Sequence, residues 1–441
     1  MKGYRDVIRQ KEYMKAIAAA VIGRFGDSVD AIALTWLIYR LTGSAAWTSV
    51  MFAMNMLPGV LLQPVAGALV EMWDKKKVLV LTDILRGILV VLAALIYVKG
   101  LMTSWILVGF TLLVTSVESF HLPASTALLP RILDKEYYTH GLSLNSTLTH
   151  SAVLVGTGAA GLILGIGGIH VAMLIDAVTF FASAVLLCTV RMKDSGSAKN
   201  ASVQTQDDVT NEARPVLTRV RASVRTVCDN IMSGFRYIKK TPVLINFCLL
   251  AFAINAILVP VNALQTPLAV DVYGRGPEVL SVVGASISIA SVLGSFLLPK
   301  LLSRFSVPAI VVTSGIIGGL CFPGLLLGGV VRTSAVLSLS VAVFFAGLMC
   351  FCMVCIGGVL GIQFMQCVAE DYLARSSAVF NAVSTASTPA CAFLVGAVAT
   401  KLSVSSIFLI SGMSCVGLFI LAAVFKIELE GNTASPAGEI A

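Results

Sequence analysis

The sequence predicts an all-α integral membrane protein with twelve membrane-spanning helices in two pseudo-symmetric bundles of six. Its 441 residues are 57% hydrophobic and 12% charged, with a mean hydropathy of +0.92, whereas a soluble domain carries about 25% charged residues. The apolar runs are about 20 residues long, which is the length of a spanning helix and not of a barrel strand. A polar segment, residues 192–241, separates two apolar halves, and each half is long enough for six spans.

The individual spans follow from apolar runs bounded by polar residues. In the first half, the predicted spans are 15–40, 45–70, 77–98, 102–122, 138–167 and 169–190. In the second half, they are 243–271, 278–302, 307–330, 333–366, 373–400 and 404–426. The first apolar run is too long for a cleaved signal segment, so we expect it to remain as a span. The predicted domains are therefore a bundle at 1–191, a linker at 192–241, a bundle at 242–428 and a tail at 429–441.

The distribution of basic residues predicts the orientation in the membrane. Of the 31 lysines and arginines, 24 lie in the tails and loops of one side, five lie on the other side, and Arg24 and Arg86 lie within spans. This bias places both termini in the cytoplasm and predicts a multi-pass protein of the cell (inner or plasma) membrane. It also explains the net charge of +8 through contact with the lipid bilayer, so no nucleic-acid partner is expected.

The linker has two parts of different character. Residues 194–213 are rich in Ser, Asn, Gln and Asp, a composition typical of disordered chain. From Pro215 onwards, apolar residues recur every three or four positions as far as Ile238, with arginines between them. This pattern predicts an amphipathic helix at the membrane surface or beneath the bundles.

An ionisable residue inside a span raises the free energy of the protein unless it is paired with another charge or in contact with water. Such residues are therefore candidates for function. Arg24, Asp27 and Asp30 share one stripe of the first span. Asp27 is interpreted either as the structural partner of Arg24 or as a group that titrates as protons cross. Glu118, placed near the cytoplasmic end of the fourth span, is a proton site, a contact for a cationic substrate or a surface charge. The proton-coupling candidates are thus Asp27, Asp30, Glu118 and Arg24.

The spans of the second half contain no central carboxylate, so their polar groups are neutral amides. Amide and aromatic side chains suit a cavity for an amphipathic small molecule. The candidates for such a cavity are Phe25, Trp36, Tyr39, Asn55, Phe252, Asn255, Asn262 and Phe380.

Several short motifs stand out along the chain. They are the run from Gly67 to Lys77, Gly26-Asp27, Asp83-x-x-Arg86, Asp176-Ala177-x-Thr-Phe180 and Gly234 to Ile238. Together they resemble the motifs of the major facilitator superfamily, in its macrolide-efflux and siderophore-exporter branch. The run from Gly67 to Lys77 is similar to the family's loop between the second and third spans, although Glu71-Met72 replaces the usual Asp-Arg pair. In the fifth span, Gly156 to Gly161 lacks the proline of the exporter signature.

The resemblance implies a monomeric secondary transporter that exports a bulky amphipathic compound, such as a macrolide-like drug or a siderophore, in exchange for protons. It also implies that Gly67, Glu71, Asp74, Lys75, Asp83 and Arg86 form a cytoplasmic gate. Asp83 and Arg86 can pair with each other at i,i+3. The alternatives are an uptake or lipid-translocating carrier, or a membrane sensor of the same fold that does not transport. With only four histidines and no Walker-type loop, no enzyme activity, metal or cofactor is expected.

Overall fold

The computed structural model describes residues 4–133, 137–191, 232–233, 235–239, 241–331, 333–368 and 370–425. Within these ranges all regular secondary structure is helical, as the hydropathy pattern predicts. Most of the predicted amphipathic helix, residues 215–231, and the predicted tail at 429–441 lie outside the described residues. Residues 235–239, at the end of that predicted helix, are helical.

Each predicted span coincides with helix in the structure. The helices of the first half are α1 (Tyr4–Ile8), α2 (Lys11–Thr42), α3 (Ala45–Met72), α4 (Lys75–Val98), α5 (Ser104–Ile132) and α6 (Tyr138–Thr189). Those of the second half are α9 (Pro242–Ala263), α10 (Gln265–Pro267), η3 (Leu268–Val272), α11 (Glu278–Leu302), α12 (Val307–Val330), α13 (Ala335–Cys367), α14 (Glu370–Val398) and α15 (Val404–Val424).

The chain divides into two compact units. The first contains Met1–Leu34 and Met54–Cys228, and the second contains Thr35–Ala53 and Asp229–Ala441. The facing ends of α2 and α3, with the short connection between them, therefore belong to the second unit. Inside that unit, the Tyr39 hydroxyl donates a hydrogen bond to Asp271 of the π-helical segment η3.

Ten helical segments among the described residues are long and apolar enough to cross a membrane. One of them lies in α6, where Gly168 has a φ of 72° and interrupts the helical backbone between the predicted fifth and sixth spans. Glycine adopts this left-handed conformation at little cost because it has no Cβ. Helix α2 is not among the ten, since it carries Arg24, Asp27 and Asp30. The fold is therefore an all-α multi-pass membrane fold, and the count of twelve crossings stays a prediction.

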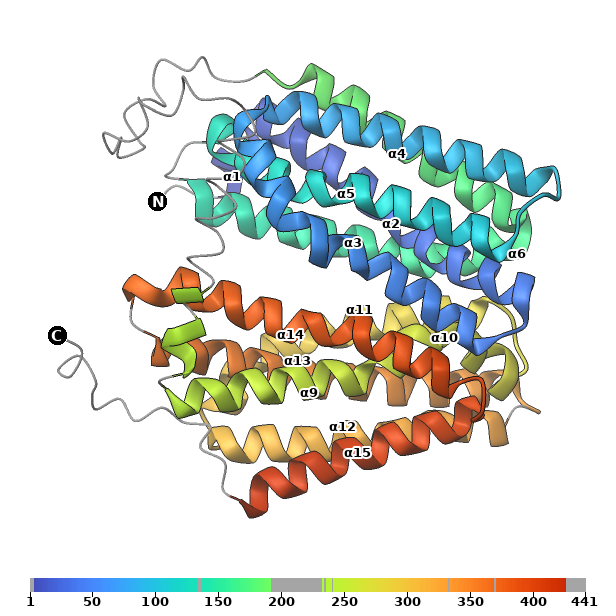
Figure 1. Ribbon diagram of the computed structural model, residues 1–441, viewed down its shortest axis with the longest axis vertical. Helices are drawn as coiled ribbons and strands as arrows, with labels where there is room; N and C mark the ends of the chain where they lie inside the picture. The colour runs from blue at the N-terminus through green and yellow to red at the C-terminus, as the bar shows by residue number, and fades with distance from the viewer. Residues whose placement is uncertain are drawn as a thin grey trace. The chain divides into compact units, whose positions relative to one another are not determined.

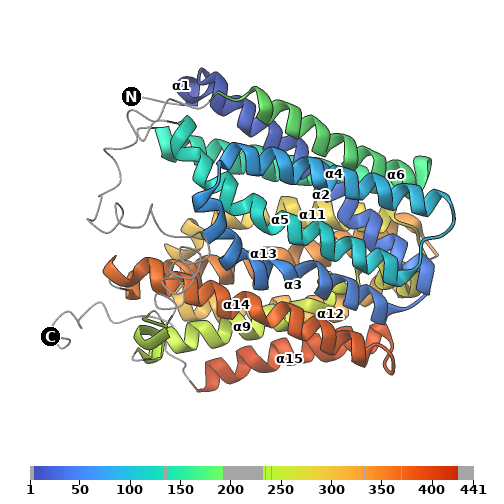
Figure 2. The same ribbon diagram turned by 45° about the horizontal axis from the view of Figure 1, so that its top comes forward.

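In the first unit, α4 packs along both α5 and α6, and the three helices lie side by side in both ribbon views (Figures 1 and 2). A buried apolar cluster joins Ile17 of α2, Leu79 of α4, Leu128 of α5 and Leu187 of α6. These residues lie near one end of their helices, so the charged residues described below occupy the next layer of the unit.

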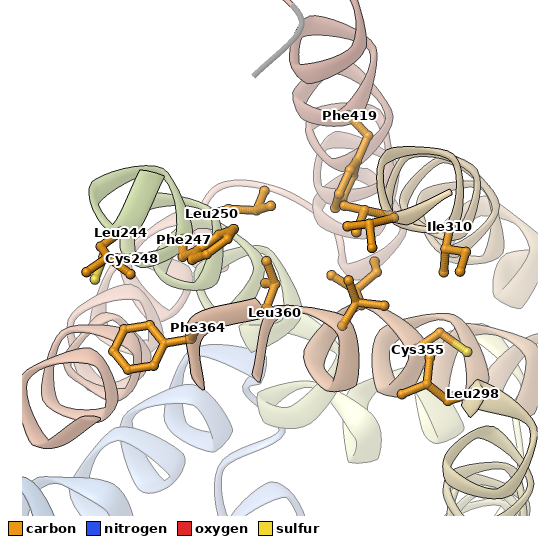
Figure 3. Packing of buried hydrophobic residues seen from close by; sticks show 14 of the residues in the cluster. Leu244, Phe247, Cys248, Leu250, Leu298, Ile310, Cys355, Leu360, Phe364 and Phe419 are labelled. Atoms are coloured by element: carbon orange, nitrogen blue, oxygen red, sulfur yellow. The ribbon is translucent and has the colours of Figure 1, made fainter. Parts of the chain in front are cut away.

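In the second unit, α13 packs against α11 and α12, α12 also contacts α15, and α14 lies along α9. One of its apolar clusters includes Phe247, Leu360, Phe364 and Phe419 (Figure 3). Cysteines such as Cys248 and Cys355 are buried within this cluster as small apolar side chains (Figure 3).

The position of Glu118 differs from the prediction. The fourth span was expected to end near residue 122, which placed Glu118 close to the cytoplasm. Helix α5 instead continues through Pro123 to Ile132, so Glu118 lies at the middle of a 29-residue helix. The helix continues because neighbouring groups in a membrane bundle compensate for the backbone hydrogen bond that an internal proline removes.

Candidate functional site

A buried arginine is the centre of a charge cluster within the first unit. Arg86 lies in the middle of α4 and is only 5% exposed. Its Nη2 donates to Asp27 Oδ1 of α2 at 2.7 Å and lies 3.6 Å from Glu118 Oε2 of α5. A single guanidinium therefore connects carboxylates from two other helices. A short charge-assisted bond of this kind is stronger than a neutral one.

Phe180 of α6 completes the surroundings of this guanidinium. The centre of its ring lies 4.1 Å from Arg86 Cζ, which is within the range of a cation–π interaction. Four helices, α2, α4, α5 and α6, thus meet at one positive charge.

Asp83, one turn before Arg86 on α4, has a separate set of partners. Its Oδ2 accepts a hydrogen bond from the Ser183 hydroxyl at 2.6 Å, and its Oδ1 lies 3.2 Å from His121 Nδ1. Thr82 Oγ1 is 3.3 Å from the same histidine nitrogen. Asp83 and Arg86 were expected to pair with each other along α4. The structure instead directs each of them to partners on neighbouring helices, because both side chains point into the bundle.

The predicted pair of Arg24 and Asp27 is present but is the weaker contact of Asp27. Arg24 Nη1 lies 3.8 Å from Asp27 Oδ2, and the Arg24 side chain is 50% exposed. An exposed ion pair at this distance contributes little, since water screens it. The structural and the functional interpretations of Asp27 therefore both involve Arg86 more than Arg24.

Two cavities lie on either side of this cluster. The first cavity, of about 260 Å³, is lined by Ala16 and Leu79, near the starts of α2 and α4, and by Leu128 and Leu187, near the ends of α5 and α6. The second cavity, of about 170 Å³, extends towards the opposite end of the unit, along Leu34, Ala93, Leu107 and Met173. Five residues line both cavities, namely Arg24, Asp27, Arg86, Glu118 and Phe180. The charge cluster is therefore the layer that separates the two cavities.

Asp30 lines the second cavity only, together with Asn55, Thr111 and Thr115. Asp83 and His121 line the first cavity only. The predicted proton-coupling residues, and two of the predicted gate residues, thus line one or both of these cavities. Sequence reasoning had divided them between two sites because helix rotation and depth cannot be read from one sequence.

Asp176 is a member of this site that is not among the predicted proton-coupling residues. It lies on α6 one turn before Phe180, is 1% exposed and lines the second cavity. Its Oδ1 has no hydrogen-bond partner among the described residues, and the same holds for Arg86 Nε. Two sequence signals pointed to it: it is an acid inside the predicted sixth span, and the motif from Asp176 to Phe180 was part of the family resemblance.

The loop residues predicted to form a gate have mixed roles. Asp74 caps α4 by accepting from the Lys77 amide at 3.1 Å, and an added Cβ on Gly67 would meet no atom within 4 Å. Lys75 is buried, and the side chain of Glu71 lies outside the described residues. Lys76 Nζ donates to the Cys188 and Val190 carbonyls at 2.7 and 2.8 Å. Their gate function stays a prediction.

The predicted cavity residues are dispersed. Asn55 lines the second cavity, whereas Phe25, Trp36, Tyr39, Phe252, Asn255, Asn262 and Phe380 line neither of the two. Asn255 and Asn262 donate to the carbonyls four residues earlier in α9, of Ala251 at 2.9 Å and of Leu258 at 3.3 Å. Phe380 packs against Phe364 with ring centres 4.7 Å apart. Their role in a substrate cavity stays a prediction.

The chemistry available to the cluster is proton binding and exchange. Four carboxylates line the second cavity, and a guanidinium that stays protonated in proteins holds one of them. A carboxylate that loses or gains such a partner changes its proton affinity strongly in a buried setting. No group of three or more His, Cys, Asp or Glu side chains that could hold a metal ion occurs in the described part of the chain.

Comparison with known proteins identifies the relationship. The sequence model of the Major Facilitator Superfamily matches residues 16–387. The MFS-type transporter YfiS of Bacillus subtilis (strain 168) is 24% identical over 430 residues, which cover 95% of this chain and 94% of that protein. Macrolide efflux protein A of Streptococcus pyogenes is 19% identical, with 93% and 94% covered. Among solved structures, the nucleoside transporter NupG superposes with a TM-score of 0.68 at 13% identity, with 95% and 100% covered.

Proposed function

Because the chain belongs to the Major Facilitator Superfamily, we propose that it is a proton-coupled exporter of a bulky amphipathic small molecule. The observation that carries this proposal is the 2.7 Å contact between Arg86 and Asp27 in the layer between two cavities. A carboxylate in this position binds a proton only when its hold on the guanidinium is released. Its protonation is therefore tied to the arrangement of the four surrounding helices, which is what a coupled carrier requires.

The cargo class is supported by relatives and by the apolar character of the second unit. Macrolide efflux protein A aligns with 93% of this chain, and the helices of the second unit contribute large apolar clusters with few charges. A macrolide-like drug or a siderophore is the cargo that we propose. The transporter acts as a monomer in the cell membrane, with both termini in the cytoplasm.

The test is flux into inverted membrane vesicles that contain the protein. A pH gradient is imposed, candidate macrolides, dyes and siderophores are added, and both cargo accumulation and collapse of the gradient are followed. One pH unit corresponds to about 1.4 kcal/mol, so one exchanged proton supports an accumulation of about tenfold per unit for an uncharged cargo.

The decisive variant is Asp27→Asn, which removes the titrating group but keeps its shape. We expect accumulation to fall to the level of empty vesicles, while the protein still folds. Glu278→Gln is the matched control. Glu278 is exposed, and its Oε1 accepts from the Gly276 amide at 2.9 Å, a bond that Gln also makes. Full gradient-driven accumulation by Asp27→Asn would remove Asp27 as the coupling residue. Transport in the opposite direction would favour an uptake carrier, and saturable binding without flux would favour a sensor.

A further inference from the structure

The second cavity contains an acid that the proposed exchange of Asp27 does not use. Asp176 is 1% exposed, it lines this cavity, and its Oδ1 lacks a partner among the described residues. A buried carboxylate with an unpartnered oxygen is costly in its charged form. The same cavity is lined by Arg24, Asp27 and Asp30 of α2, Arg86 of α4 and Glu118 of α5. With Asp176 these are four acids against two arginines, so full ionisation would leave an excess of two negative charges.

One contact of Asp176 and one contact of its neighbour Phe180 place this acid beside the charge cluster. A Cβ built on Gly26, the residue before Asp27, would lie 2.6 Å from Asp176 Oδ1. The Asp176 carboxylate is therefore in contact with the backbone of α2 beside Asp27. On the other side, Phe180, one turn after Asp176, lies under the Arg86 guanidinium at 4.1 Å. Residues four apart on a helix are neighbours on one face, so Asp176 lies beside the residue whose ring contacts that guanidinium.

Arg86 also offers an unused donor. Its Nη2 is taken by Asp27 and Glu118, whereas its Nε is buried and has no partner among the described residues. An unpaired buried donor and an unpaired buried acceptor thus line one cavity. Both groups gain from meeting, since a buried polar group left unpaired costs about 1–3 kcal/mol.

We propose, on the basis of the coupled exchange above, that Asp176 is a second proton-binding residue and that Arg86 exchanges its carboxylate partner between Asp27 and Asp176. In one state, Asp176 carries the proton while Arg86 binds the Asp27 carboxylate. In the other state, Asp27 carries the proton while Arg86 binds the Asp176 carboxylate.

The transfer between these states balances in charge and in atoms. An O–H bond on Asp176 breaks, an O–H bond on Asp27 forms, and the proton crosses through water in the cavity that both residues line. The guanidinium keeps all its protons and moves only its hydrogen bond. Because the total charge of the cluster does not change, the exchange requires no other ion. Since Asp27 also lines the first cavity, the proton then leaves towards the opposite end of the unit.

The first experiment detects the proton on Asp176 directly. Infrared difference spectra of the purified protein, recorded between acidic and alkaline buffer, show the carbonyl stretch of a protonated carboxylic acid. We expect a band that disappears in Asp176→Asn and remains in Asp30→Asn, which removes another acid from the same cavity. In Asp27→Asn, Arg86 loses its carboxylate partner on α2 and turns to Asp176, so the Asp176 band should weaken. A spectrum in which Asp176→Asn loses no band overturns the proposal, whether or not the protein transports.

The second experiment separates coupling from cargo movement. In proteoliposomes, Asp176→Asn should still exchange labelled for unlabelled cargo in the absence of a gradient. Its accumulation under a gradient of one pH unit should fall from about tenfold to about onefold, because no proton is exchanged. Wild-type accumulation by Asp176→Asn refutes the role of Asp176 but leaves the exporter function intact. A wild-type protein that never responds to the gradient refutes the exporter function, and the infrared band then still decides the protonation of Asp176.

Discussion

Replacing Gly26 by Ala tests the contact between α2 and α6 on which the charge cluster depends. The added Cβ would lie 1.9 Å from Thr179 Oγ1, 2.6 Å from Asp176 Oδ1 and 2.9 Å from Thr179 Cβ. All three distances are shorter than any van der Waals contact, so the two helices must move apart or Thr179 must leave its place. Thr179 is held by a bond from its hydroxyl to the Asp176 carbonyl at 2.7 Å.

Inserting a methyl group into a packed interior of this kind costs about 1–3 kcal/mol. Gly23→Ala is the matched control, because a Cβ on Gly23, one turn earlier on the same helix, meets no atom within 4 Å. That change should be neutral or stabilising by up to about 1 kcal/mol, since alanine favours the helix over glycine.

The measurement is the free energy of unfolding of purified protein in mixed micelles of increasing denaturing detergent. Gly26→Ala should unfold at lower detergent than Gly23→Ala and should also lose gradient-driven transport. Thr179→Ala removes the nearest atom, so the double variant with Gly26→Ala should recover part of the loss. A coupling energy of about 0.5–3 kcal/mol is expected for two residues in contact. Equal stability of Gly26→Ala and Gly23→Ala would show that α2 and α6 are not packed as described.

Two further predictions concern single hydrogen bonds. The Lys15 ammonium, and after it the Arg191 amide, lower the pKa of Glu12 below its ordinary value of 4.5. A lowered pKa in the folded state stabilises the protein above the unfolded pKa, and that stabilisation is lost as pH falls through the folded pKa. Glu12→Gln should therefore reduce stability at neutral pH and match the wild type in acid, and a difference that grows in acid would contradict this sign. In the second unit, Tyr39→Phe removes the hydrogen bond to Asp271 and should cost about 1 kcal/mol. A double-mutant cycle with Asp271→Ala, which removes the acceptor, should show coupling between the two residues, and its absence would contradict that contact.

The positions of the helices could be predicted because each spanning helix corresponds to a run of about 20 mostly apolar residues in the sequence. The predicted boundary between 167 and 169 coincides with Gly168, whose positive φ interrupts α6. The expected end of the fourth span near residue 122 was wrong, because the polar residues and Pro123 that interrupt the apolar run do not end the helix. In a bundle, helix α5 accommodates Pro123 and continues to Ile132.

The sequence could predict which residues belong to the charge cluster, but not which of them contact one another. Asp27, Glu118 and Arg86 stood out as ionisable residues in apolar runs, but their meeting depends on the rotation and depth of three separate helices. The i,i+3 pair of Asp83 and Arg86 was expected from spacing alone. Spacing along one helix cannot show that Ser183 and Asp27, on other helices, offer closer partners.

The aromatic ring of Phe180 has a consequence of its own for the arginine above it. Every other partner that the structure gives to the Arg86 guanidinium is an acid that a proton can neutralise. The ring attracts the cation equally well at any pH, because its quadrupole has no ionisable group. Whichever acid takes a proton, Arg86 keeps one constant attraction. Phe180 thus provides a contact of Arg86 that does not depend on protonation. A tyrosine or tryptophan in its place would preserve this contact, whereas a leucine would fill similar space without the attraction.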